Sequence, residues 1–311
     1  MTFRKLRSLL AAAMLSLPLP AFAQATEAPV AAPPKPAAVP ASIPSDPALW
    51  VVKDKDTTIY LFGTIHVLKP GLSWFDQAVK TAFDASDTLV LEMVQPDAAT
   101  MQGIVMKAGF TTGGQTLPEK LAPGDRAAYL SALSGLGLPP TALDRAQPWL
   151  AATQLSLIPV IKAGYDPSNG PETVLGAAAK AGGKQVVGLE TAEQQIGYFG
   201  TLPEDLQVKF LNSTVKELPK VGDTLAGMVS DWSAGRPKEL GKTMNEGMRE
   251  TPEIGKILLA DRNVRWASWI DQRMKQPGTV FVAVGAGHLA GSDSVIEQLK
   301  KRKLKAKRID Y

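Results

Sequence analysis

The sequence predicts an α/β protein in which a mixed central β-sheet is flanked by helices and carries a largely helical cap region. Short runs rich in β-branched or aromatic residues alternate with longer stretches of helical period, which is typical of βαβ units. A Lys-Asp-Lys-Asp segment at 53–56 indicates a hairpin, so the sheet begins with an antiparallel pair. Residues 96–175 and 203–273 are mostly helical in pattern, and they predict the cap over the sheet.

The individual elements follow from these patterns in chain order. Apolar runs bounded by turn residues predict strands at 49–52, 57–62, 88–91, 185–188, 279–284 and 305–309. Amphipathic periodicity predicts helices at 74–85, 97–108, 124–134, 146–162, 172–181, 193–199, 203–218, 223–233, 238–246 and 254–274. Alternation of the two kinds of element favours one sheet with helices on its faces.

The first 23 residues have the organisation of a cleavable signal peptide. Three cations precede an apolar run of about a dozen residues, and an Ala-Phe-Ala sequence ending at Ala23 supplies the cleavage site. A membrane span needs roughly 20 apolar residues, and two prolines interrupt this run. We expect cleavage after Ala23 and a periplasmic or secreted protein with no membrane span after cleavage.

Residues 24–44 form a Pro/Ala-rich, nearly uncharged segment that we expect to be a linker, because it cannot bury enough apolar surface to fold. Residues 45–311 then form one domain, which is long enough for a sizeable core. The chain has no cysteine, which excludes disulfides and thiolate-bound metal. Any metal site must therefore use histidine, carboxylate, carbonyl or water ligands.

The strongest charge pattern of the domain lies near its C-terminus. The formal net charge of +4 includes the three cations of the signal peptide, so residues 24–311 carry only +1. The run KKRKLKAKR at 300–308 is compatible with a nucleic-acid or anionic-surface patch. We favour instead a solvated last helix turn and an edge strand protected by lysines, and we expect no nucleic-acid partner.

Both histidines of the chain occur in one short motif, Gly-x-x-His at the end of an expected strand. FGTIH ends at His66, and VGAGH ends at His288. Glycine lets the chain leave a strand through conformations that a Cβ opposes, and ligand sites of open α/β sheets lie at the carboxyl ends of strands. We therefore expect the two histidines to meet at one site.

Two glutamates follow apolar strands in the same way, Glu92 after TLVL and Glu190 after QVVGL. A carboxylate in this position is poorly solvated unless it is paired, hydrogen-bonded or bound to a metal. Together with the histidines they form an N/O ligand set suited to a divalent metal with one position left for water. Structural roles are the alternative: a hydrogen-bonded histidine, Glu92 capping a turn or paired with an arginine, and Glu190 before a helix capped by Thr191.

A resemblance to a known family rests on five segments of the chain: LWVVKDKDTTIYLFGTIHVL, TLVLEM, YDPSNGPETVLGAAAKAGGKQVVGLETAEQQ, ADRNVRW and FVAVGAGHLAG. In this order, they make the chain resemble the TraB/GumN (TraB/PrgY/GumN) family, which is related to the Tiki metalloproteases. The resemblance covers nearly the whole mature length. It implies a fold of the TraB/Tiki-like kind, within the EreA/ChaN-like superfamily.

The resemblance also implies a metal-dependent peptidase centre. Its metal-binding residues here are His66, His288 and Glu92, with manganese or cobalt favoured and zinc or iron also compatible. Glu190 is a second acidic candidate for the catalytic role. In the cell envelope such a centre would act as a hydrolase in which metal-activated water attacks an amide or ester.

Two residues of the late helix, Arg262 and Asn263, match the Arg-Asn pair of the family and are further catalytic candidates. A guanidinium offers fixed, permanently charged donors, so Arg262 suits an oxyanion or a substrate carboxylate. A structural salt bridge is the alternative for Arg262. The chain has no H-E-x-x-H helix, so a zincin mechanism does not apply.

Several points stay open at the level of the sequence. Either Glu92 or Glu190 could be the metal ligand, with the other as proton acceptor. A non-catalytic envelope protein that binds metal, haem or a polymer is the alternative function, and an accessory factor acting through protein contacts is the third. The sequence does not specify the peptide or small-molecule substrate or the oligomeric state.

Overall fold

The computed structural model describes residues 42–246 and 251–311 of the chain. The expected signal peptide and nearly all of the expected linker lie outside the described residues. Regular structure begins with β1 (Ile43–Pro44), which pairs in parallel with β4 (Leu72–Ser73), so it starts just before the domain boundary expected at Ser45. In the described part of the chain, we find no helix with the length and apolar character needed to cross a membrane.

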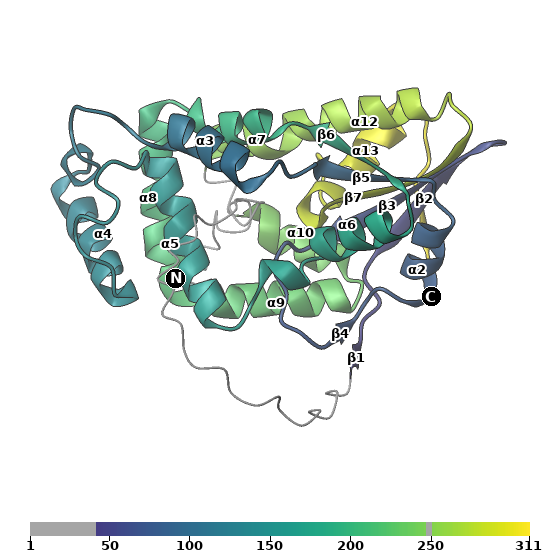
Figure 1. The fold of residues 1–311 in the computed structure, drawn as a ribbon, viewed down its shortest axis with the longest axis horizontal. Coiled ribbons are helices and arrows are strands. Elements are labelled where there is room, and N and C mark those ends of the chain that lie inside the picture. The colour runs from purple at the N-terminus through teal and green to yellow at the C-terminus, as the bar shows by residue number, and fades with distance from the viewer. Residues whose placement is uncertain (1–41, 247–250) are drawn as a thin grey trace, which may run out of the picture.

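A six-stranded mixed sheet forms the centre of the protein, as the sequence predicted (Figure 1). Its strands, in order across the sheet, are β6 (Gln185–Glu190), β5 (Thr88–Met93), β7 (Gly278–Gly285), β3 (Thr57–Thr64), β2 (Leu49–Lys53) and β8 (Lys307–Ile309). The first four are mutually parallel, and β2 is antiparallel to both of its neighbours. The four parallel strands therefore end at one edge of the sheet.

Helices cover both faces of this sheet, because alternate side chains of each strand point to opposite sides. The face with Phe62 and Phe281 packs on α2 (Gln77–Asp84), α6 (Pro171–Ala181), α9 (Val221–Ser233) and α10 (Pro237–Glu246). The face with Ile59 and Val282 packs on α12 (Asp261–Arg273) and α13 (Val295–Lys301). Figure 1 shows α12 and α13 on one side of the strands, with α6 and α9 on the other.

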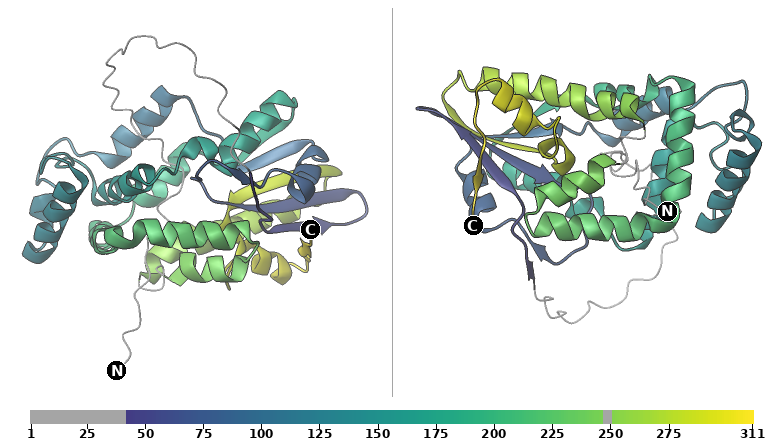
Figure 2. Two further views of the ribbon diagram at one scale, coloured as in Figure 1. Left: turned by 90° about the horizontal axis from the view of Figure 1, so that it is seen from below. Right: turned by 180° about the vertical axis from the view of Figure 1, so that it is seen from behind.

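A cap of helices forms a group with its own core beside the sheet, at the left of Figure 1. It is smaller than the cap predicted from residues 96–175 and 203–273, because α9, α10 and α12 of the second segment pack on the faces of the sheet instead. Its helices are α3 (Ala98–Gly109), α4 (Pro123–Leu136), α5 (Pro148–Lys162), α7 (Ala192–Gly200) and α8 (Glu204–Glu217). They pack around Tyr129, Trp149 and Phe210. Because α3 follows β5 and α7 follows β6, the group joins the sheet at the carboxyl edge of the parallel strands; Figure 2 shows the same arrangement from two further directions.

The helix predicted over residues 254–274 is confirmed as one uninterrupted helical run. It consists of α11 (Pro252–Gly255), a π-helical turn (Lys256–Ala260) and α12. The π-helical turn within it was not predicted, because apolar periodicity does not distinguish one wider turn from an α-helical turn. Arg262 donates from Nη1 to the carbonyl oxygen of Leu258 at 3.2 Å, which links the side chain of α12 to this turn. Short 3-10 turns lie at Pro118–Lys120, Pro167–Asn169, Leu218–Lys220 and Ala286–Leu289.

The buried indole of Trp232 connects α9 to the end of β3, and its contribution to stability can be tested. Its Nε1 donates to the carbonyl oxygen of Gly63 at 2.7 Å, and its ring packs against Phe62. We expect Trp232→Phe to lower the free energy of unfolding by about 1–3 kcal/mol, because this buried carbonyl loses its donor. Urea unfolding measures the change. The control is Tyr60→Phe on the same strand, expected to change stability by less than about 0.5 kcal/mol, and equal effects of the two variants would contradict this account.

Candidate functional site

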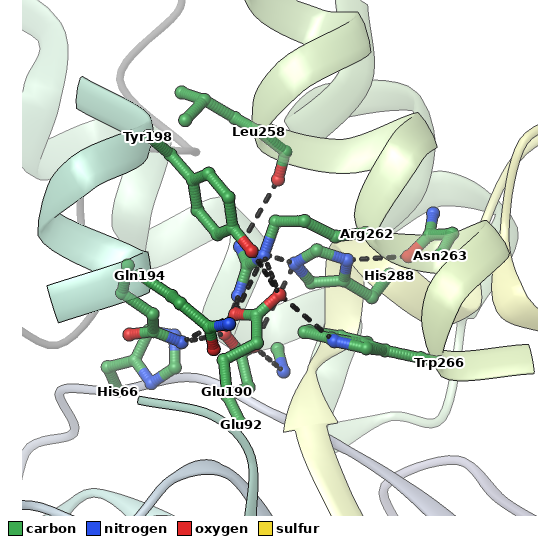
Figure 3. Close-up of polar contacts among 12 residues, drawn as sticks. His66, Glu92, Glu190, Gln194, Tyr198, Leu258, Arg262, Asn263, Trp266 and His288 are labelled. Carbon is green, nitrogen blue, oxygen red and sulfur yellow. Dashed lines mark hydrogen bonds and ion pairs between the residues drawn. The ribbon is translucent and has the colours of Figure 1, made fainter. Parts of the chain in front are cut away.

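The carboxyl ends of the four parallel strands bring the predicted residues together (Figure 3). β3 leads directly to His66, and β7 leads into the 3-10 turn that contains His288. Glu92 is the penultimate residue of β5, and Glu190 is the last residue of β6. Segments that are far apart in the sequence thus contribute one polar cluster at the edge of the sheet.

Gly285 is the point on which three of these side chains converge. A Cβ built on this glycine would lie 3.1 Å from Glu92 Oε1, 3.5 Å from His66 Nε2 and 3.6 Å from His288 Cδ2. The backbone N–H of Gly285 also donates to Glu92 Oε1 at 2.7 Å. The glycine of the second Gly-x-x-His motif therefore favours this close approach, since a Cβ here would be tight against Glu92 Oε1 and in van der Waals contact with both histidines.

The guanidinium of Arg262 is the centre of a buried ion-pair network (Figure 3). Its Nη2 donates to Glu92 Oε2 at 2.6 Å and to Glu190 Oε2 at 2.7 Å, and its Nε donates to both oxygens of Glu190. Its Nη1 lies 3.3 Å from His288 Nε2. Arg262 is only 2% exposed, so these charges are balanced by one another and not by solvent.

Glu190 accepts hydrogen bonds on both of its carboxylate oxygens. Besides Arg262, the donors are Trp266 Nε1 at 3.1 Å, Tyr198 OH at 3.1 Å and Gln195 Nε2 at 3.2 Å. The structural alternative for this segment, a helix that begins after Glu190, is also present, because Thr191 caps α7 in a capping box. The end of β6 therefore does two things: Glu190 binds Arg262, and Thr191 starts α7.

Each histidine is held at Nδ1 by an oxygen acceptor. His288 Nδ1 lies 2.6 Å from Asn263 Oδ1, and Asn263 in turn donates from Nδ2 to the carbonyl oxygen of Asp293. His66 Nδ1 lies 2.6 Å from Glu172 Oε1. Both rings thus have an anchored Nδ1 and present Nε2 toward Glu92. Asn263 was predicted from the sequence as a site residue.

Glu172 was missed, and so was Gln195, which donates to Glu92 Oε2 as well as to Glu190. The signal available for Glu172 was its place in YDPSNGPETV, one of the segments that carry the family resemblance. Its position in the first turn of α6 has an ordinary structural explanation, because acidic residues favour helix starts.

Burial and neighbouring charges shift the pKa values of the two histidines in opposite directions. Burial lowers the pKa of His288 to about 3, which keeps the ring neutral at pH 7. Burial also opposes the charged form of His66, but the adjacent Glu172 carboxylate raises its pKa above the ordinary 6.5. Burial alone would raise the pKa of Glu92, yet Arg262 and the two histidines lower it to about 2, so Glu92 is ionised.

The arrangement has the donor types of a metal site but not a closed ligand cage. Within residues 42–246 and 251–311, no three His, Asp or Glu side chains stand grouped so that they could hold a metal ion as they are. His288 Nε2 is 3.8 Å from Glu92 Oε1, and Arg262 supplies the positive charge beside this carboxylate. An ion would have to draw the side chains closer and replace the contact between Arg262 and His288.

Comparison with known proteins gives a family match and several distant relatives. The sequence model of the TraB/PrgY/gumN family matches residues 48–308. An uncharacterized protein of Treponema pallidum (strain Nichols) is 22% identical over 272 residues, with 82% of this chain and 80% of the relative covered. The uncharacterized protein YbaP of Escherichia coli (strain K12) is 24% identical over 254 residues, with 82% and 92% covered. No solved structure matches the chain.

Removal of the central cation should be costly. We expect Arg262→Met to lower the free energy of unfolding by about 3–5 kcal/mol, because it leaves Glu92 and Glu190 as uncompensated buried charges. The matched control is Arg265→Met, since Arg265 is half-exposed and lies 3.8 Å from Glu190 Oε1; it should cost less than about 1 kcal/mol. Chemical denaturation at pH 7 measures both, and a small loss for Arg262→Met would contradict the central role of this residue.

The two histidines predict opposite dependences of stability on pH. Because the pKa of His288 is about 3 in the folded state and 6.5 in the unfolded state, the unfolded chain binds the extra proton as pH falls below 6.5. This costs about 2 kcal/mol between pH 6.5 and 4.5. The raised pKa of His66 acts the other way, with its stabilisation fully present below 6.5 and lost as pH rises through the folded pKa.

We therefore expect His288→Gln to reduce the loss of stability on acidification from pH 6.5 to 4.5. His66→Gln should leave this loss nearly unchanged, but it should remove the stabilisation that the wild type loses as pH rises above 6.5. Urea unfolding of the wild type and both variants at pH 4.5, 6.5 and 8.5 measures these differences. Equal losses on acidification for the wild type and His288→Gln would contradict a lowered pKa of His288, and equal losses above pH 6.5 for the wild type and His66→Gln would contradict a raised pKa of His66.

Proposed function

The chain belongs to the TraB/PrgY/gumN family, and we propose that it is a metal-dependent hydrolase of the cell envelope that cleaves an amide or ester bond. The observation that carries the proposal is the convergence of His66 Nε2, Glu92 Oε1 and the His288 ring on Gly285. The envelope location rests on the proposed signal peptide of residues 1–23.

The residues present fit a divalent ion by their chemistry. Two imidazole nitrogens and a carboxylate oxygen are ligands that manganese, cobalt, zinc and iron all accept, and we favour manganese or cobalt. Histidine ligands typically have the other ring nitrogen bonded to a carboxylate or carbonyl, and Glu172 and Asn263 stand in these places for His66 and His288. A bound ion would supply a Lewis acid for the substrate carbonyl and a water of lowered pKa.

The roles of the two glutamates can be divided on their hydrogen bonds. Glu92 Oε1 faces the two histidines and has a lowered pKa, which suits a ligand that must be ionised. Glu190 has donors on both oxygens, and these favour anchoring of Arg262 over the proton-acceptor role considered from the sequence. In this proposal, Glu92 is the ligand and Glu190 holds the cation beside it.

Arg262 is the residue that we assign to the developing negative charge of the substrate. Its Nη1 is 3.3 Å from His288 Nε2, so it is the guanidinium nitrogen in contact with a proposed ligand atom. A donor held there by Glu190 and by the carbonyl of Leu258 costs little reorganisation when an oxyanion forms.

The first experiment is titration of the metal-stripped full chain with Mn²⁺, Co²⁺ and Zn²⁺. We expect about one ion per chain for the wild type and none for the folded His66→Ala/His288→Ala variant, because the variant lacks two of the three ligands. Glu297→Gln, which removes a carboxylate of α13 that pairs only with the exposed Lys300 among the contacts described, is the control and should bind like the wild type.

A peptide library incubated with the loaded protein then tests hydrolysis. Cleavage by the wild type but not by the double variant is the expected result. Binding of one ion without cleavage would favour the non-catalytic binding protein, and an absence of ion binding by the wild type would contradict the hydrolase.

A further inference from the structure

We propose that Glu172 is a positioning residue for His66, and that the segment 166–172 is built to deliver its carboxylate to the ring. The expected effect on metal affinity rests on the proposed function, whereas the effect of Glu172 on the ring of His66 does not require a bound metal. Glu172 fixes which nitrogen of His66 carries the proton and therefore which nitrogen can accept a ligand.

The carboxylate of Glu172 lies against the first Gly-x-x-His motif. Glu172 Oε1 lies 2.6 Å from His66 Nδ1 and accepts a second hydrogen bond from the hydroxyl of Thr64. The Thr64 side chain is buried, and the side chains of His66 and Glu172 are 14% and 22% exposed. The same oxygen thus receives two donors from the first Gly-x-x-His motif, one from its strand and one from its histidine.

The backbone holds the segments that contain His66 and Glu172 close together. Leu68 and Asp166 exchange two backbone hydrogen bonds, at 3.0 and 3.3 Å, so the segment after His66 is paired with the segment before Glu172. Gly170 then passes so close to the histidine that an added Cβ would lie 2.3 Å from the carbonyl oxygen of His66. A glycine is therefore required where α6 begins, and its close approach sets the distance from the helix start to the ring.

The hydrogen bond between Glu172 and His66 determines which ring nitrogen carries the proton. A carboxylate accepts hydrogen bonds only, so its partner Nδ1 must carry a proton, and in the neutral ring Nε2 then keeps its lone pair. His66 Nε2 is the atom that faces Gly285. The second histidine has an amide oxygen in the equivalent place, so the two rings share an orientation, but only His66 gains a charged acceptor that makes its ring a stronger ligand.

The alternative is that Glu172 only starts α6, as acidic residues often do. In that case the proton position on His66 would not depend on Glu172. Because the chain has two histidines, nitrogen NMR of the full chain labelled with ¹⁵N-histidine contains only two rings, and it reports the protonated nitrogen of each one directly.

The experiment records these spectra for the metal-free protein at a pH where both rings are neutral. In the wild type we expect His66 to be protonated on Nδ1 and unprotonated on Nε2. Glu172→Ala should lose this preference, whereas Glu172→Gln, whose amide oxygen can still accept from Nδ1, should restore it. Thr64→Val removes the other donor to the same oxygen and should leave the His66 signals in the Nδ1-protonated pattern.

Two results would overturn the assignment: a wild-type His66 protonated on Nε2, or an unchanged Nδ1-protonated ring in folded Glu172→Ala. The wild-type spectrum decides the matter even if Glu172→Ala does not fold. Mn²⁺ titration is the second measurement, and we expect about 10–100-fold weaker binding for Glu172→Ala and near wild-type binding for Thr64→Val. If the wild type binds none of Mn²⁺, Co²⁺ and Zn²⁺, the hydrolase proposal fails, while the spectra still decide the role of Glu172.

Discussion

The buried ion pairs of Arg262 are the interaction on which the carboxyl edge of the sheet depends. Two adjacent strands place Glu92 and Glu190 at this edge, and each charge would be strongly penalised by burial if left alone. The balancing cation comes from α12, which packs on one face of the sheet and follows a π-helical turn. The charge balance therefore fixes the position of a helix relative to two strands, and the ring of Trp266 from the same helix lies against His288.

Around this network, the site has two halves with different electrostatic character. His288 is buried and neutral, and its acceptor is the uncharged Asn263. His66 is more exposed and has a raised pKa, and its acceptor is the carboxylate of Glu172. Glu92 lies between the two rings and is ionised. One strand-end motif used twice thus gives two histidines of unequal basicity, because the segments packed on them differ.

Much of the fold could be predicted from the sequence, because it depends on local patterns. The six strands of the sheet and the first antiparallel pair follow from apolar runs and a turn, and the glutamates after two of these runs were expected to need partners. The two-residue strands β1 and β4 carry no periodicity, and the π-helical turn has an α-like apolar pattern. Glu172 could not be predicted as a partner of His66, since their contact depends on how residues 166–170 pack against a segment about a hundred positions earlier.

The place of β7 in the sheet determines when this protein can fold. It lies between β5 and β3, yet nearly the whole chain precedes it, and its backbone contact with Glu92 spans 193 positions. A chain that lacks its final portion has β3 and β5 without the strand that joins them, with unpaired edges on both. Pairings between such distant segments form slowly and leave strand edges exposed in the meantime. Completion of the sheet is consequently a late event in folding, and a nascent chain holds no assembled site until β7 has been inserted.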